Sequence, residues 1–223
     1  PRERDGDADP LAGREPFTWE RDGSSDIYLL PVGESAPLRL TTDPAPDRSP
    51  AWRPDGQEIA FSSRRDGNSE IYVANLRDGT LRRITRDPAF DGAPHWSPDG
   101  RWLVFESYRD DNLDLYIIQA DGQGSPQRLT QHPAQDDSPI WAPDGRHILF
   151  ISRRDGLPDI FLVPLDAVGE DTAVNLTNTP DQAEAQPAIA PDGSALAYSV
   201  THAGGALVQS LPLNADLLPA GPV

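Results

Sequence analysis

The sequence predicts an all-β protein of the β-propeller class, and three observations carry this prediction. A Pro-x-Trp-x-Pro-Asp-Gly motif occurs at residues 50–56, 94–100 and 139–145, and a weaker Pro-x-Ile-x-Pro-Asp-Gly copy occurs at 187–193. The motif Asp residues of successive copies lie 44, 45 and 48 positions apart. Each period contains four short runs of strand-forming residues separated by turn sequences, which is the content of one propeller blade.

Four strands are expected in each full repeat. The first strand ends at the Pro-Asp-Gly turn, where Pro fixes φ and Gly supplies a positive φ. The second is apolar on both faces, as at 58–62 and 147–151, which is typical of a strand inside a stack of sheets. An Asp-Gly turn often separates it from the third strand, as at 70–73 and 159–162. The fourth carries charge beside a Leu-Thr pair, which suits an exposed outer edge.

The period predicts five four-stranded blades in one propeller domain over residues 1–223. The repeats span about 4–42, 47–86, 91–131, 136–178 and 184–213. In the first repeat the Pro-Asp-Gly turn has decayed to residues 10–13, and the last repeat lacks a Leu-Thr strand. We therefore expect the N-terminal segment to complete the final sheet, because closing the ring removes exposed strand edges. A six-bladed ring and an incomplete ring are the alternatives.

The composition excludes several classes of function. The 223 residues include no Cys, so disulfides, thiol catalysis and Cys-ligated zinc are ruled out. A net charge of -17 argues against nucleic acid and against anionic membrane surfaces, which both attract basic proteins. No apolar run approaches the roughly 20 residues needed to cross a bilayer, so we expect no membrane insertion. We expect a monomer that binds a protein or peptide partner.

The repeats resemble the PD40 repeat, also called the WD40-like repeat of TolB-type propellers. The resemblance covers about residues 17–213 and rests on the Pro-Asp-Gly motif, the Ile-x-Phe-x-Ser run, the Arg-Asp-Gly turn, the Ile-Tyr pair and the Leu-Thr pair. It implies a β-propeller that acts mainly in protein–protein interaction, usually in bacterial periplasmic or extracellular proteins. TolB itself has six blades and an additional N-terminal domain, so the resemblance does not carry over the partner of TolB.

The family resemblance also implies rival functions. The same repeats form accessory domains of prolyl-oligopeptidase-like peptidases, sensor ectodomains and the body of some oligogalacturonate lyases. The chain starts at Pro1 without a signal segment, and we expect a trimmed product of a periplasmic or extracellular protein. Our prediction is a non-catalytic module that recognises a protein, peptide or sugar at the channel mouth. The alternative is the propeller domain of an enzyme or of a sensor.

An acidic residue stands three positions before the first Pro of each motif. The four residues are Asp47, Asp91, Asp136 and Glu184. Since the first strand of a blade lines the central channel, we expect these side chains to form a ring at one mouth. Converging carboxylates suit Ca²⁺ or another hard cation, or a basic ligand. The alternative is a turn residue that caps the backbone at the start of the strand.

Arginine recurs in the turn after the second strand, at Arg21, Arg65, Arg109 and Arg154, with extra arginines at Arg64 and Arg153. These side chains are expected at the same end of the ring as the acids. They form either ion pairs with neighbouring carboxylates or a ligand-facing rim. Trp19 is off the repeat template and is a candidate recognition aromatic.

No catalytic residue is predicted. The four His residues, His95, His132, His147 and His202, occupy different positions of the repeat, and no Gly-x-Ser-x-Gly or phosphate-binding loop is present. An enzyme would need the side chains of His95, His132 and His202 to converge on one face.

Overall fold

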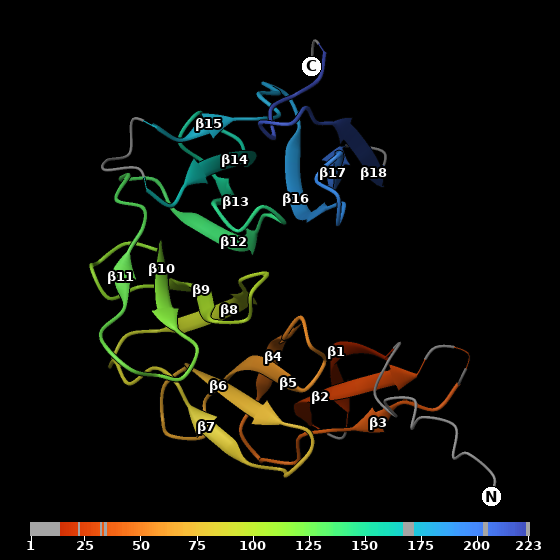
Figure 1. The fold of residues 1–223 in the computed structure, drawn as a ribbon, viewed down its shortest axis with the longest axis vertical. Helices are drawn as coiled ribbons and strands as arrows, with labels where there is room; N and C mark the ends of the chain where they lie inside the picture. Colours follow the sequence, from red (N-terminus) through yellow and green to blue (C-terminus); the bar gives the residue numbers. More distant parts are fainter. Residues whose placement is uncertain are drawn as a thin grey trace, which may run out of the picture.

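The computed structural model describes residues 14–221 except 22, 32, 34, 167–171 and 203–204. The described regular structure consists of antiparallel strands in five sheets, placed one after another around a common axis (Figure 1). Each sheet is formed by one repeat. The predicted β-propeller of five blades is therefore confirmed.

The strands follow the chain order blade by blade. The first blade contains β1 (Arg14–Arg21), β2 (Ser24–Pro31) and β3 (Leu38–Arg39). The second contains β4 (Asp47–Trp52), β5 (Glu58–Ser63), β6 (Glu70–Asn75) and β7 (Leu81–Arg83). The third contains β8 (Asp91–Trp96), β9 (Trp102–Ser107), β10 (Asp114–Gln119) and β11 (Gln127–Arg128). The fourth contains β12 (Asp136–Trp141), β13 (His147–Ser152), β14 (Asp159–Pro164) and β15 (Val174–Asn175). The fifth contains β16 (Ala183–Ile189), β17 (Ala195–His202) and β18 (Gly205–Pro212).

The three middle blades have four strands each, and the first and last have three among the described residues. The inner strands β4, β8, β12 and β16 lie nearest the axis (Figure 1). By position in the repeat, the described residues include no inner strand for the first blade and no outer strand for the fifth. The expected degenerate turn at 10–13 lies outside the described residues.

Each inner strand contains a β-bulge with a left-handed residue. The pairing register shifts between Arg48 and Ala51 in β4, and the same shift recurs in β8, β12 and β16. The strained residues are Ser49, Ala93, Ser138 and Gln186, whose φ values lie between 45° and 54°. A positive φ in a residue other than Gly is uncommon, so its repetition in four blades marks a feature of the fold.

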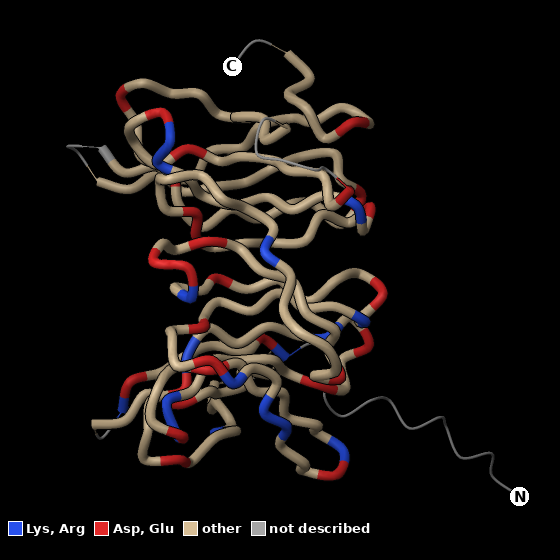
Figure 2. The backbone as a smooth tube through the Cα atoms, turned by 90° about the vertical axis from the view of Figure 1, so that its left-hand side faces the viewer, with Lys and Arg blue, Asp and Glu red and all other residues tan. Residues whose placement is uncertain are grey.

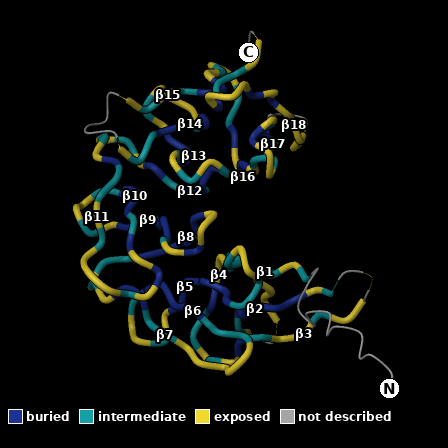
Figure 3. The backbone as a smooth tube through the Cα atoms, in the orientation of Figure 1, coloured by how far each residue is buried: buried dark blue, intermediate teal, exposed yellow. Residues whose placement is uncertain are grey.

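The hydrophobic core lies between blades rather than within them. One cluster joins Ile27 and Leu29 of β2 to Phe61 of β5, and similar clusters join each later pair of successive blades. The largest fully buried side chains are Phe61, Phe105 and Phe150, which occupy the same position in three blades. Figure 3 shows this burial along the middle strands of the blades.

Two motif tryptophans tie successive blades together by hydrogen bonds. Trp52 Nε1 donates to the Arg14 carbonyl at 2.8 Å, and Trp96 Nε1 donates to the Ala51 carbonyl at 3.1 Å. Trp141 also packs between blades, but its Nε1 has no partner among the described residues.

The first and last blades are not joined by a packed strand interface among the described residues. β18 pairs with β17 alone, and its Leu207 and Val208 are 53% and 81% exposed. The N-terminal residues from Arg14 onward pair with β2, and residues 1–13, expected to close the ring, lie outside the description. No described helix is long and apolar enough to span a membrane.

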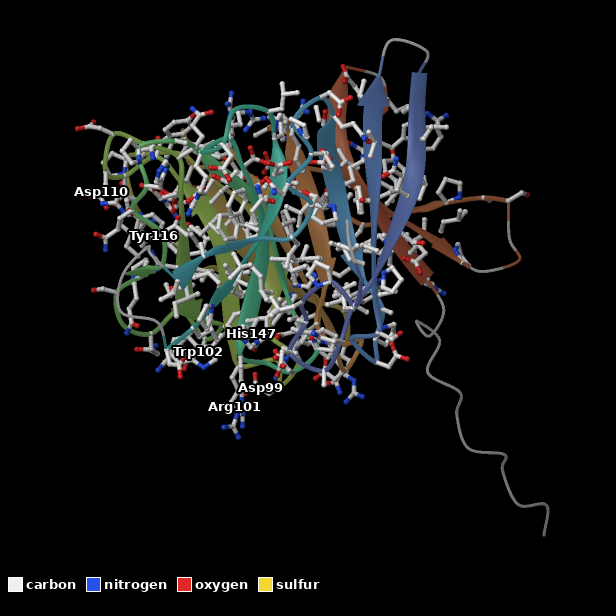
Figure 4. The ribbon with its side chains drawn as sticks, turned by 90° about the horizontal axis from the view of Figure 1, so that it is seen from above. Asp99, Arg101, Trp102, Asp110, Tyr116 and His147 are labelled. Atoms are coloured by element: carbon white, nitrogen blue, oxygen red, sulfur yellow. The ribbon has the colours of Figure 1, made fainter. Side chains whose placement is uncertain are left out.

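The two ends of the ring carry different turns. We call the mouth the end where the inner strands start and where the turns after β5, β9 and β13 lie. Figure 4 shows Asp110 of the mouth at the opposite end of the third blade from Asp99 and Arg101 of the Pro-Asp-Gly turn. Many of the charged residues lie in the loops of both ends (Figure 2).

Replacing Phe105 by Ala should destabilise the protein by about 4 kcal/mol, because it empties a fully buried position between the second and third blades. Leu81→Ala is the matched control, since Leu81 is 43% exposed, and it should change the free energy of unfolding by less than ~0.5 kcal/mol. Urea unfolding followed by Trp fluorescence measures both. Equal losses for the two variants would contradict the inter-blade core.

Candidate functional site

The two predicted sets of mouth residues contact each other. In the second blade Arg65 Nη2 donates to both carboxylate oxygens of Asp47 at 2.9 Å, and Arg65 Nε donates to Ser63 Oγ at 2.9 Å. The same arrangement recurs as Arg109 with Asp91 and as Arg154 with Asp136, at 2.9 and 3.0 Å. We call these the Asp–Arg pairs.

Burial and stacking hold the Asp–Arg pairs rigid. The three Asp side chains are fully buried, whereas the Arg side chains are 10–15% exposed. The guanidinium of Arg109 lies 5.4 Å from the ring centroid of Phe105 and 4.6 Å from that of Tyr116, within the range of cation–π attraction. Burial raises the pKa of Asp91, and hydrogen bonds from Ser107 and Arg109 oppose that rise. The carboxylates therefore have little capacity left for a ligand.

A second layer of acids lies near the start of the third strand of each of the first four blades, at Asp26, Glu70, Asp114 and Asp159. Arg39 bonds Asp26 at 2.5 Å, Arg83 bonds Glu70 at 2.9 Å and Arg128 bonds Asp114 at 2.6 Å. These acids are buried, and each has its own cation. The fourth blade differs, because Asn175 takes the place of Arg and donates to Asp159 at 2.8 Å.

Glu184 differs from the three Asp residues in having no arginine partner within the described part of the chain. Thr179 donates to one of its carboxylate oxygens, and Thr177 Oγ1 lies 3.3 Å from the other and 3.5 Å from Asp159. The position that matches Arg154 is His202, whose side chain lies outside the description. Burial raises the pKa of Glu184 to about 7; the Thr179 bond lowers it and the neighbouring Asp159 raises it further.

The remaining sequence candidates lie apart from one another. Trp19 is 37% exposed on β1, in edge contact with Tyr28 at 5.0 Å and with the Arg21 guanidinium 5.3 Å from its ring. His95 Nδ1 accepts the amide of Trp141, and His132 Nδ1 accepts the amide of Ala134. His147 lies at the end opposite the mouth, against Asp144 (Figure 4).

A cavity of about 330 Å³ opens at the mouth between the second and third blades. Its lining includes the guanidinium-bearing side chains of Arg48 and Arg64, the hydroxyls of Ser62 and Ser69, and Phe90, with Ser49, Ala93, Pro46 and Glu106 completing the wall. Neither guanidinium has a hydrogen-bond or ion-pair partner within the described part of the chain. We call this cavity the mouth pocket.

Glu106 forms the far wall of the mouth pocket. One of its carboxylate oxygens accepts the amide of Ser138, the left-handed bulge residue of the next blade, at 3.1 Å. Burial raises the pKa of Glu106, and the nearby Asp137 raises it further. The pocket is therefore lined by two positive groups and at most one negative group.

Sequence reasoning did not single out Arg48, and it treated Arg64 only as an extra arginine. A comparison of blades would have found both. Adding 89 to their numbers gives Asp137 and Arg153 in the fourth blade, where the two side chains form an ion pair at 2.7 Å. The signal in the sequence is a change of charge at one of these two positions, where the fourth blade has the acid Asp137 and the second blade has Arg48.

No group of three or more metal-ligating side chains is brought together in the residues that the structure describes. The oxygens of Asp47, Asp91 and Asp136 are each bonded by an arginine. The geometry at these positions is that of a structural ion pair.

The fold and the mouth together define a repeat-built β-propeller whose mouth carries the buried Asp–Arg pairs and the mouth pocket, which Arg48 and Arg64 line. The family model "PD40: TolB beta propeller domain" matches residues 10–90 and 85–217. The chain therefore belongs to the TolB β-propeller family, as the repeat motif predicted.

Solved structures support the same fold. TolB from Acinetobacter baumannii superposes with a TM-score of 0.73 at 23% identity, over 92% of this chain and 54% of that one. A protein described as TolB from Agrobacterium tumefaciens superposes with a TM-score of 0.74 at 27% identity, over 89% of this chain and 76% of that one. An oligogalacturonate lyase in complex with manganese superposes with a TM-score of 0.65 at 16% identity, over 90% of this chain and 59% of that one. This chain thus spans about half the length of the first of these proteins, and no curated protein matches it.

Removing the arginine of one Asp–Arg pair should destabilise the folded protein. Arg109→Met leaves the buried Asp91 carboxylate without its partner, and we expect a loss of about 3 kcal/mol in unfolding free energy. Arg101→Met is the control, because Arg101 is 80% exposed and 3.9 Å from Asp99, and it should cost less than ~0.5 kcal/mol. Chemical denaturation measures the unfolding free energy of both variants. A loss of stability for Arg109→Met no larger than that for Arg101→Met would show that the Asp91–Arg109 pair is dispensable.

Stability should depend on pH through Glu184. The pKa of Glu184 is about 7 in the folded protein and 4.5 ordinarily, so the folded state favours the protonated carboxyl. The stability that this group contributes is therefore fully present below pH 4.5 and is lost as the pH rises through 7. The total loss is at most about 3 kcal/mol. Glu184→Gln should flatten the curve of stability against pH over this range, measured by urea unfolding at each pH. An unchanged curve in the variant would assign the dependence to another group.

Proposed function

We propose that this chain is a non-catalytic binding module of a bacterial periplasmic or extracellular protein, and that it recognises a protein or peptide segment at the mouth. The mouth pocket is the observation that carries the proposal. The guanidiniums of Arg48 and Arg64 have no partner among the residues that the structure describes, whereas Arg65, Arg109 and Arg154 are each bonded to a buried carboxylate. Both guanidiniums are exposed to solvent and open to a ligand, and a few well-placed polar groups in a preformed pocket fix the orientation of what binds there.

The surroundings of the pocket support recognition of a macromolecule. Tyr108 is 43% exposed at its rim, in edge contact with Phe90, and aromatic residues are enriched at protein interfaces. The pocket alone is too small for a large ligand, so the partner would insert one side chain and cover the rim with the rest of its surface. Membership of the TolB family and the likeness to TolB structures favour a binding role over catalysis.

Orientation on a solid support tests the proposal. The chain has no Cys, so Arg77→Cys and Tyr108→Cys each introduce a single attachment point. Arg77 lies in the exposed turn after β6, which ends at Asn75 opposite Glu58 and therefore away from the mouth, whereas Tyr108 contacts Phe90 of the pocket lining. Beads that carry the Arg77→Cys protein should enrich a partner from cell-envelope extract, and beads that carry the Tyr108→Cys protein should not, because the support covers the mouth.

Two results would contradict the proposal. Equal enrichment by both bead types would place the binding surface away from the mouth. Recovery of a chemically altered partner, detected by mass spectrometry, would favour the enzyme alternative.

A further inference from the structure

The second and fourth blades fill the same pair of mouth positions with different charges. In the fourth blade Asp137 follows the paired Asp136, and Arg153 precedes the paired Arg154. Arg153 Nη1 donates to Asp137 Oδ2 at 2.7 Å. The two positions are therefore within ion-pair distance of each other in this fold.

Both positions are arginine in the second blade. Arg48 follows Asp47, and Arg64 precedes Arg65, so the backbone places them as it places Asp137 and Arg153. The acid of the fourth blade has been replaced by a cation, and the negative charge that would lie between the two positions is missing. Two like charges side by side repel each other, and an anion between them removes that repulsion.

The rest of the pocket fits a small anionic group. The hydroxyls of Ser62 and Ser69 lie in its wall, although Ser62 Oγ and Ser69 Oγ are already bonded to the carbonyls of Arg48 and Asp91. The free donors are therefore the guanidiniums, whose planar fork matches a carboxylate in a bidentate manner. Glu106 on the far wall reduces the net charge of the lining to about one positive unit. That charge balances a carboxylate monoanion better than a dianionic phosphate.

We propose that the mouth pocket binds a carboxylate of a partner protein, held between Arg48 and Arg64. The carboxylate takes the place that Asp137 fills beside Arg153 in the fourth blade. This inference rests on the proposed function and names the chemistry of the partner segment. An acidic side chain reaches the pocket, and Phe90 and the exposed Tyr108 contact the residues that flank it.

The test compares two end-blocked tripeptides, Ser-Glu-Gly and Ser-Gln-Gly, by NMR titration of the folded protein. The pair differs only in the carboxylate, so the Glu peptide should bind at least tenfold more tightly. Inorganic phosphate is the third probe, and it should compete less well than the Glu peptide. Equal affinity for the two peptides, or stronger binding of phosphate, would overturn the assignment.

Arg48→Asp is the decisive variant, because it builds the ion pair of the fourth blade into the second. It should fold at least as stably as the parent and lose at least tenfold in affinity for the Glu peptide. Arg77→Asp makes the same change of charge at the opposite end, where the Arg77 side chain has no partner in the described structure, and should bind as the parent does. Arg64→Ser removes the other cation without creating a pair, and it decides the question if Arg48→Asp folds poorly.

The outcomes separate this inference from the proposed function. If Arg77→Cys beads enrich a partner and Arg48→Asp leaves both that capture and the peptide affinity unchanged, the binding module stands and the carboxylate site falls. If no partner is enriched but Glu-peptide binding depends on Arg48 and Arg64, the carboxylate site stands without the macromolecular role.

Discussion

The buried carboxylates at the start of the inner strands are the constraint on which the mouth depends. A carboxylate without solvent must be paired, and the turn after the second strand of each middle blade supplies the arginine that pairs it. This requirement fixes the turn against the inner strand and sets the position of every neighbouring side chain. The rim is consequently rigid, and differences between blades at adjacent positions become differences in what the rim can bind.

Departures from the repeat carry more functional information than the repeat itself. The Asp–Arg pairs are common to three blades and therefore describe architecture. Asn175 of the fourth blade stands where Arg83 and Arg128 pair an acid in the second and third blades, and Arg48 stands where the fourth blade alone has an acid, Asp137. Glu184 has no arginine partner among the described residues, and its raised pKa favours the protonated form, whereas at the second blade the charge is, as proposed, balanced by a ligand.

The sequence predicted the architecture well because spacing alone encodes it. The Pro-Asp-Gly motifs and the alternation of turns with apolar runs gave the blade number, and the motif tryptophans proved to lie between blades. The left-handed conformation of Ser49 and Ala93 could not be predicted, because neither residue favours a positive φ and the strain is imposed by the sheet. The sequence predicted that Asp91 and Arg109 lie at the same end of the ring, but it left ion pairs and a ligand-facing rim as alternatives, because two residues 18 positions apart meet only after the hairpin has formed.

Packing that runs only from each blade to the next has a consequence for how the molecule opens. Among the described residues, a blade in the middle is held on two sides, whereas the first and fifth are held on one, so local unfolding should start at the ends and spread inward. Amide protons of β17 and β18 would then exchange with solvent sooner than those of β9 and β10. The mouth pocket lies between the second and third blades, one blade away from the nearer terminal blade, so it should keep its shape when a terminal sheet opens.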